Sequence, residues 1–76
     1  MLGIASNFNI CGGSACIAGT RIPVWLLEQA RRLGMSETDL LLAYPTLRNE
    51  DLANAWAYVN SHREEIEKEI RENEQA

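Results

Sequence analysis

Most of the chain after residue 23 places apolar side chains every three to four positions, which is the spacing of amphipathic helices. The first stripe predicts a helix over residues 24–33 that ends at Gly34. Its apolar members are Val24, Leu27 and Ala30. Capping-box spacing that begins at Ser36 predicts the start of a second helix, which Pro45 ends. The core stripe of this helix is Leu40, Leu41 and Tyr44.

A third helix is predicted to begin near Arg48 or Asn49. Its apolar stripe is Leu52, Ala55, Trp56 and Val59, whereas Asn54, Tyr58 and Asn60 lie off it. Ser61 has capping-box spacing to Glu64 and predicts a fourth helix from Ser61 onward. Ile66 and Ile70 are the only apolar residues of 64–74, a stripe too thin to hold a helix alone. The two isoleucines therefore pack either on this domain or on another chain, and residues 73–76 are expected to fray.

The chain before residue 24 has a different pattern. Apolar residues at even positions predict a short strand within residues 1–10, and these are Leu2, Ile4, Phe8 and Ile10. This strand is expected to pair with residues 16–22 or with the same strand of a second copy. Glycines and β-branched residues over 12–24 predict a hairpin that turns near Gly19 and continues into the first helix at Pro23. The sequence thus predicts a mainly α fold with a short N-terminal β-hairpin.

Length and charge restrict the function. Seventy-six residues form one small domain, which buries only about 60% of its unfolded surface, so association with a partner or a second copy is attractive. Residues 1–35 carry three basic groups and one acidic group, net +2, and residues 36–76 carry four basic and ten acidic groups, net −6. The acidic half suits a protein partner better than nucleic acid. No signal peptide and no membrane span is predicted, so a cytoplasmic location is expected.

The candidate chemistry does not indicate an enzyme. Cys11 and Cys16 have only His62, remote in sequence, as a further zinc ligand, and zinc needs about four. The same single histidine leaves a cysteine nucleophile without a base and an orienting group. Gly12-Gly13-Ser14 lacks the lysine of a phosphate-binding loop. We therefore predict no catalytic residue, no metal and no cofactor, with Cys16 as a buried small apolar residue.

Some of these residues resemble a known family. Gly12-Gly13 and the run Cys16-Ile-Ala-Gly-Thr-Arg-Ile-Pro-Val24 resemble the signature of the bacterial domain of unknown function 433 family, roughly G-G-x-P-x-I-x-G-T-R-I-x-V. The similarity continues in Leu33–Ser36, Tyr44–Leu47 and Glu50–Leu52, and covers about residues 10–61. The resemblance implies a homeodomain-like helix-turn-helix bundle of the first three helices. It also implies a VapB-type antitoxin that pairs with a PIN-like ribonuclease toxin.

The expected domain organisation follows. Residues 1–61 form the hairpin and the three-helix helix-turn-helix bundle, and residues 62–76 form an acidic C-terminal helix with a frayed tail. The second and third helices are the helix-turn-helix pair. Trp56 is expected in the core, and Trp25 at the rim of the core rather than at an interface.

A recognition helix places its N-terminal residues against base edges. The candidate DNA-binding residues are Arg21, Arg48, Asn49 and Asn54. Glu50 and Asp51 would be repelled by phosphate, so weak binding by a monomer is expected. The family has threonine where this chain has Arg48, so the helix cap either shifts to Asn49 or is lost. Two interpretations of Arg21 stay open. In the functional one, its guanidinium contacts a phosphate or a carboxylate of a partner. In the structural one, it is a surface arginine or is paired to a local backbone carbonyl.

The candidate partner-binding residues are Glu65, Ile66, Glu69 and Ile70. The glutamates would mimic RNA in the basic groove of a ribonuclease while the isoleucines pack below. The predicted function is therefore the antitoxin of a type II toxin–antitoxin system, which neutralises a PIN-like ribonuclease and helps to repress its own operon. The alternative is a non-enzymatic homodimeric interaction module without DNA binding.

Overall fold

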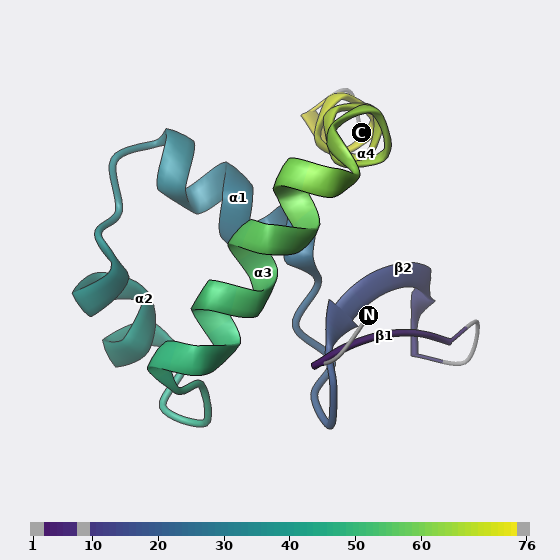
Figure 1. The fold of residues 1–76 in the computed structure, drawn as a ribbon. Coiled ribbons are helices and arrows are strands. Elements are labelled where there is room, and N and C mark those ends of the chain that lie inside the picture. Colours follow the sequence, from purple (N-terminus) through teal and green to yellow (C-terminus); the bar gives the residue numbers. More distant parts are fainter. Residues whose placement is uncertain (1–2, 8–9, 75–76) are drawn as a thin grey trace.

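The computed structural model describes residues 3–7 and 10–74, and within them a two-stranded antiparallel hairpin precedes four helices (Figure 1). The elements are β1 (Ile4–Asn7), β2 (Ile10–Ile17), α1 (Val24–Arg32), α2 (Glu37–Ala43), α3 (Asn49–Ser61) and α4 (Arg63–Glu74). The mainly helical fold with an N-terminal hairpin is therefore confirmed. No helix of the described residues is both long enough and apolar enough to cross a membrane.

The hairpin forms between β1 and β2. Ile4 lies opposite Ile17, and the register shifts after Ser6, so that residues 11–14 of β2 bulge. The predicted turn at Gly19 is present, with φ of +79°. The residues after this turn do not form a strand, and Cys16 and Pro23 form only an isolated β-bridge across it. Of residues 16–22, which were predicted to pair with the first strand, only residues 16 and 17 do so. The predicted strand positions Leu2 and Phe8 lie outside the described residues.

Local signals set the ends of α1 and α2. Gly34 has φ of +102°, and the Gly34 and Met35 amides donate to the carbonyls of Arg31 and Ala30, both at 3.1 Å. This pair of bonds is a Schellman motif and satisfies carbonyls that the helix end leaves free. At the start of α2, the Ser36 hydroxyl and the Asp39 carboxylate each accept the other residue's amide at 3.1 Å. Both predicted boundaries are confirmed.

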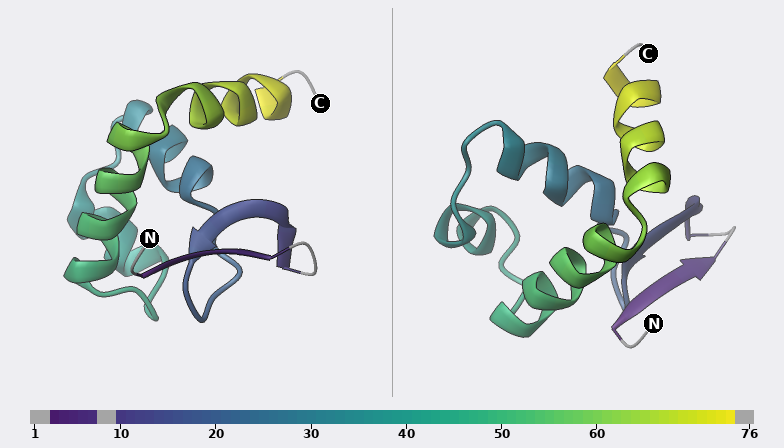
Figure 2. Two further views of the ribbon diagram at one scale, coloured as in Figure 1. Left: turned by 45° about the vertical axis from the view of Figure 1, so that its right-hand side comes forward. Right: turned by 45° about the horizontal axis from the view of Figure 1, so that its top comes forward.

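The predicted boundary at Ser61 is wrong. Ser61 is the last residue of α3, and its hydroxyl donates to the carbonyls of Ala57 and Tyr58 at 3.1 and 3.2 Å. The chain leaves helical geometry only at His62, whose ring stacks on Tyr58 with the ring centroids 3.9 Å apart. Because the Ser61 hydroxyl is engaged within α3, it does not cap α4. In Figures 1 and 2, α4 lies at the end of α3 that is remote from α2, above the hairpin.

The core lies between β2 and the four helices. Its largest fully buried side chains are Ile17, Leu27, Leu40, Leu52, Ile66, Val24 and Val59. Ile66 and Ile70 belong to the same cluster, so α4 packs on this domain. The prediction for α3 needs correction in two places: Tyr58 is buried, whereas Trp56 is only partly buried. Trp25 is partly buried against the core, as expected of a rim residue.

Candidate functional site

The N-terminal end of α3 is exposed and carries Arg48 and Asn49. Arg48 occupies the N-cap position, where it cannot accept a hydrogen bond, so the side-chain cap is lost. Its amide donates to the Asp51 carboxylate at 2.9 Å, and its guanidinium lies 3.0 Å from Glu50 and 4.0 Å from Asp51. Two carboxylates therefore partly neutralise the cation that was predicted to contact DNA.

Asn54 does not extend from the same surface. It is partly buried, and its side chain lies against Gly3 beside the hairpin. A Cβ atom placed on Gly3 would come within 2.3 Å of Asn54 Nδ2. The predicted DNA-binding set is thus divided, because Arg48 and Asn49 are exposed while Asn54 packs against the chain's own N-terminal segment.

Arg21 is exposed in the connection between β2 and α1. This connection and the start of α3 both lie along the lower edge of the molecule in Figure 1. The neighbouring turn is held by Thr20, whose hydroxyl donates to the Ile17 carbonyl at 2.8 Å and accepts the Ile22 amide at 3.1 Å. Arg21 is therefore presented to solvent by a fixed turn.

The arginines of α1 are engaged within the molecule. Glu28 is 5% exposed, and its carboxylate accepts hydrogen bonds from Arg31 at 2.5 Å and Arg32 at 2.8 Å. Arg32 also forms an ion pair with Glu67 of α4, and its bonds to Glu67 and Glu28 raise its pKa above the ordinary value. Arg31 lies over the Trp56 ring, 4.0 Å from the ring centroid. The helical spacing of Glu28 to both arginines was a signal that the sequence already carried.

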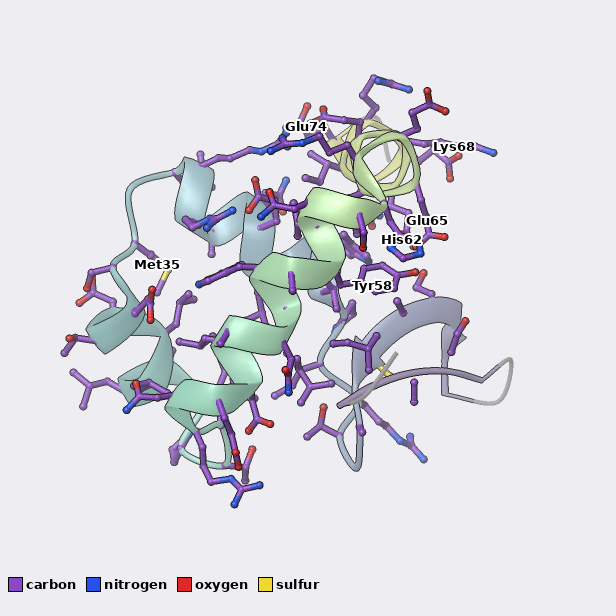
Figure 3. All side chains as sticks on the ribbon, in the orientation of Figure 1. Met35, Tyr58, His62, Glu65, Lys68 and Glu74 are labelled. Carbon is purple, nitrogen blue, oxygen red and sulfur yellow. The ribbon has the colours of Figure 1, made fainter. Side chains whose placement is uncertain are left out.

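The predicted partner-binding residues of α4 lie on two different sides. Ile66 and Ile70 are 0% and 5% exposed, so their side chains are not available to a partner in this structure. This differs from the expectation that they pack beneath a bound ribonuclease, because both already lie in the core cluster of the domain, where α4 contacts α1 and α3. Glu65 is exposed and accepts a hydrogen bond from the Tyr58 hydroxyl, whose pKa is raised by burial and by this carboxylate. Figure 3 shows Tyr58, His62 and Glu65 together at the α3–α4 junction.

Glu69 lines a groove of about 310 Å³ between β2 and α4. The other lining residues are Gly12, Gly13, Ser14, Glu65, Lys68 and Glu72. Burial raises the pKa of the Glu69 carboxyl, a hydrogen bond with Ser14 opposes the shift, and the charges of Glu65 and Glu72 add to it. The sequence did not predict this groove, because no feature of residues 12–14 or of their neighbours in sequence indicates that α4 lies beside them.

Cys16 is a free thiol, 1% exposed, as predicted for a small buried residue. Its Sγ donates to the Thr20 carbonyl at 3.6 Å. Within residues 3–7 and 10–74, no three His, Cys, Asp or Glu side chains are grouped as metal ligands would be. The Cys11 side chain, the other thiol considered, lies outside the described part of the chain.

A family model described as "Protein of unknown function (DUF433)" matches residues 4–59, from the first strand to near the end of α3. The chain belongs to this family. A crystal structure of a DUF433 member protein from Anabaena variabilis ATCC 29413 is similar over 91% of this chain and 68% of that chain, with 43% sequence identity and a TM-score of 0.88. No curated protein matches the chain. The DUF433 match ends before α4, so the acidic helix lies outside the matched residues.

Proposed function

We propose that this DUF433 protein is the antitoxin of a type II toxin–antitoxin pair and neutralises a PIN-like ribonuclease by direct binding. The observation that carries the proposal is the outer surface of α4, where Glu64, Glu65 and Glu72 are exposed above a base of buried isoleucines. A ribonuclease that binds RNA needs a basic groove, and a rigid acidic helix is complementary to it. The resemblance to VapB-type antitoxins supports the same partner class.

The structure changes how this helix would act. Because Ile66 and Ile70 fix α4 to the domain, the helix meets its partner through charged side chains rather than through an apolar stripe. Charge complementarity of this kind increases the association rate and weakens as salt is added. The domain body then acts as a support that holds the carboxylates in place.

Co-expression with a ribonuclease encoded beside this protein tests the proposal. We expect the full chain to restore growth that the ribonuclease alone suppresses, and to elute with it as one complex. A charge reversal on α4, Glu64→Lys, should weaken the complex more than Glu50→Lys at the exposed start of α3. An absence of both growth rescue and co-elution for the wild-type chain would refute the antitoxin role.

We also propose that a homodimer, or its complex with the ribonuclease, binds operator DNA through the start of α3. The supporting observation is that Arg48 and Asn49 are exposed there, with the Arg48 side chain 75% exposed. Two copies would double the phosphate contacts that one monomer lacks. Arg48→Ala should weaken a gel shift of the upstream DNA, whereas Arg63→Ala on α4 should not. No shift at low salt, with or without the ribonuclease, favours the interaction module without a DNA role.

A further inference from the structure

The two edges of the hairpin differ in what covers them. On the β2 side, the chain that leads into α1 returns along the strand, and the Ile17 amide donates to the Ile22 carbonyl at 3.0 Å. On the β1 side, no further strand of the described residues pairs with the sheet, which consists of β1 and β2. Helix α3 meets β1 at its start, where Asn54 lies against Gly3, and in the right-hand view of Figure 2 the strand runs away from α3. The free edge of the sheet is therefore that of β1, from Ile4 onward.

The register of the hairpin decides which main-chain groups this edge presents. The Ala18 amide donates to the Gly3 carbonyl at 2.9 Å. Hydrogen-bonded and non-hydrogen-bonded pairs alternate in an antiparallel ladder, so the next pair, Ile4 and Ile17, is not hydrogen-bonded. The amide and carbonyl of Ile4 consequently point away from β2, and those of Ser6, two residues further in the same register, do so too. Outside the hairpin, no backbone hydrogen bond among the described residues engages these groups.

The edge also lacks the features that usually prevent a strand from pairing with another chain. Natural proteins commonly block such edges with charged side chains or proline. Residues 3–7 contain neither, and Arg21 is the first charged residue of the sequence. The whole chain has a net charge of −4, so two copies repel each other over much of their surfaces, whereas this uncharged strand adds no repulsion. A second copy can therefore approach most easily along β1.

We propose that β1 pairs antiparallel with β1 of a second copy about a two-fold axis at Ala5, which joins the two hairpins into one four-stranded sheet. In this register Ile4 lies opposite Ser6 of the second copy, and Ser6 lies opposite Ile4 of the second copy. Every outward amide and carbonyl of these residues then has a partner. The two Ala5 methyl groups face each other across the axis, where a small side chain fits.

Two properties of the pairing favour a second copy over an unrelated strand. Antiparallel pairing of identical strands has the two-fold symmetry of most homodimers, so one edge is sufficient for both partners. A two-stranded sheet is marginally stable, and both copies gain from its extension. The pairing needs neither DNA nor the ribonuclease, although it supplies the homodimer on which the proposed operator binding rests.

Sedimentation velocity of the full-length chain over a range of concentrations tests the interface. We expect a monomer–dimer equilibrium whose dissociation constant rises about tenfold or more in Ser6→Pro, because proline removes an amide that each copy donates across the interface. Proline is tolerated where an edge amide faces solvent, so the monomer should still fold. Ser6→Ala is the matched control. It loses the same hydroxyl bond to the Gly13 carbonyl but keeps the amide, and should dimerise like the wild type.

A charge exchange at Ala5 tests the position of the axis. Ala5→Lys and Ala5→Glu should each dimerise more weakly than the wild type, because like charges would then lie directly opposite each other. An equal mixture of the two variants should associate more strongly than either variant alone. A mixture that associates no better than its components would overturn this register. Urea midpoints in dilute solution confirm that each variant folds.

The interface and the proposed function fail in different ways. A wild-type chain that stays monomeric at every concentration, or a dimer that is equally strong in Ser6→Pro, overturns the interface. A monomeric wild-type chain that nevertheless binds the ribonuclease refutes the interface and leaves the antitoxin role standing. A wild-type dimer that depends on the Ser6 amide but shifts no upstream DNA supports the interface and refutes the operator role alone.

Discussion

Gly3 lies close against the Asn54 side chain of α3. It has φ of +79°, and a Cβ there would lie 2.3 Å from Asn54 Nδ2. Gly19 has the same φ but nothing within 4 Å of such a Cβ. Gly19→Ala should therefore destabilise by about 1 kcal/mol through backbone strain alone, and Gly3→Ala by about 1–3 kcal/mol more through the clash. Urea unfolding measures both.

The Asn54 side chain provides the control for this comparison. In an Asn54→Ala background the clashing atoms are gone, so Gly3→Ala should cost no more than Gly19→Ala does. If Gly3→Ala and Gly19→Ala are equally destabilising in the wild-type background, Asn54 does not pack against Gly3. In that case Asn54 would again be a candidate for a DNA contact.

Glu28 is the buried charge on which the α1 arginines converge. Glu28→Gln keeps the shape but removes the charge that pairs with Arg31 and Arg32. Because both arginine side chains are about 40% exposed, at 41% and 39%, water compensates part of the loss. We expect a loss of about 1–2 kcal/mol in unfolding free energy. Glu50→Gln, in an exposed pair with Arg48, should change stability by less than about 0.5 kcal/mol, and equal effects would contradict the assignment.

Among the elements, α4 holds two glutamates whose pKa values shift in opposite directions. Hydrogen bonding to Arg32 lowers the pKa of Glu67, so its contribution to stability is present at neutral pH and is lost as pH falls through the folded-state pKa. Burial raises the pKa of Glu69, so its contribution is present at low pH and is lost as pH rises through that pKa. Glu67→Gln should destabilise the protein at pH 7, and Glu69→Gln should leave it as stable or more stable.

Both differences should shrink as the pH falls, because the wild-type carboxyls become protonated as well, that of Glu67 only at a pH below its lowered pKa. Urea midpoints at acidic and neutral pH measure the effect. A destabilising Glu69→Gln at neutral pH would mean that the Glu69 carboxylate already has a favourable partner in the free protein.

The helix boundaries differ in how much the sequence could predict. The Ser36 capping box and the Gly34 turn depend on groups within five residues, so local pattern was sufficient for both. Ser61 carried a similar signal, but α3 continues through it because Tyr58 and His62 pack together at the break. The turn at Gly19 and the pairing of the first strand with residues 16 and 17 were predicted, but the pairing with residues 10 and 15 and the register shift after Ser6 were not, because no local pattern marks them.

The candidate site shows the same limit. Helical periodicity was sufficient to place Arg48 and Asn49 at an exposed helix start and to place a row of glutamates on α4. The Arg32–Glu67 pair joins residues 35 apart in sequence, and the Asn54–Gly3 contact joins α3 to the N-terminal segment. Neither has a local pattern. The isoleucines of α4 could have packed either on this domain or on another chain. Periodicity shows that a stripe of a helix is apolar, but it does not show which surface covers that stripe.

At the level of the whole molecule, these isoleucines decide whether α4 can be removed. Ile66 is fully buried and Ile70 is 5% exposed, in the same core cluster as Leu27 and Val59. A small chain has a net stability of about 0.05–0.15 kcal/mol per residue, and losing one such side chain costs about 2–5 kcal/mol. Truncation after His62 removes both, together with the Arg32–Glu67 pair. The shortened chain should therefore lose its cooperative unfolding transition.

Truncation after Glu72 is the matched control, because it removes Asn73 and Glu74, which are exposed, and the two residues beyond them. It should shift the urea midpoint only slightly. If the chain ending at His62 instead unfolds cooperatively at the wild-type midpoint and keeps a dispersed NMR spectrum, then α4 is a separable appendage. Its loss of ribonuclease binding would then report directly on the partner surface. If that chain unfolds, as we expect, only point substitutions on the outer face of α4 can separate binding from folding.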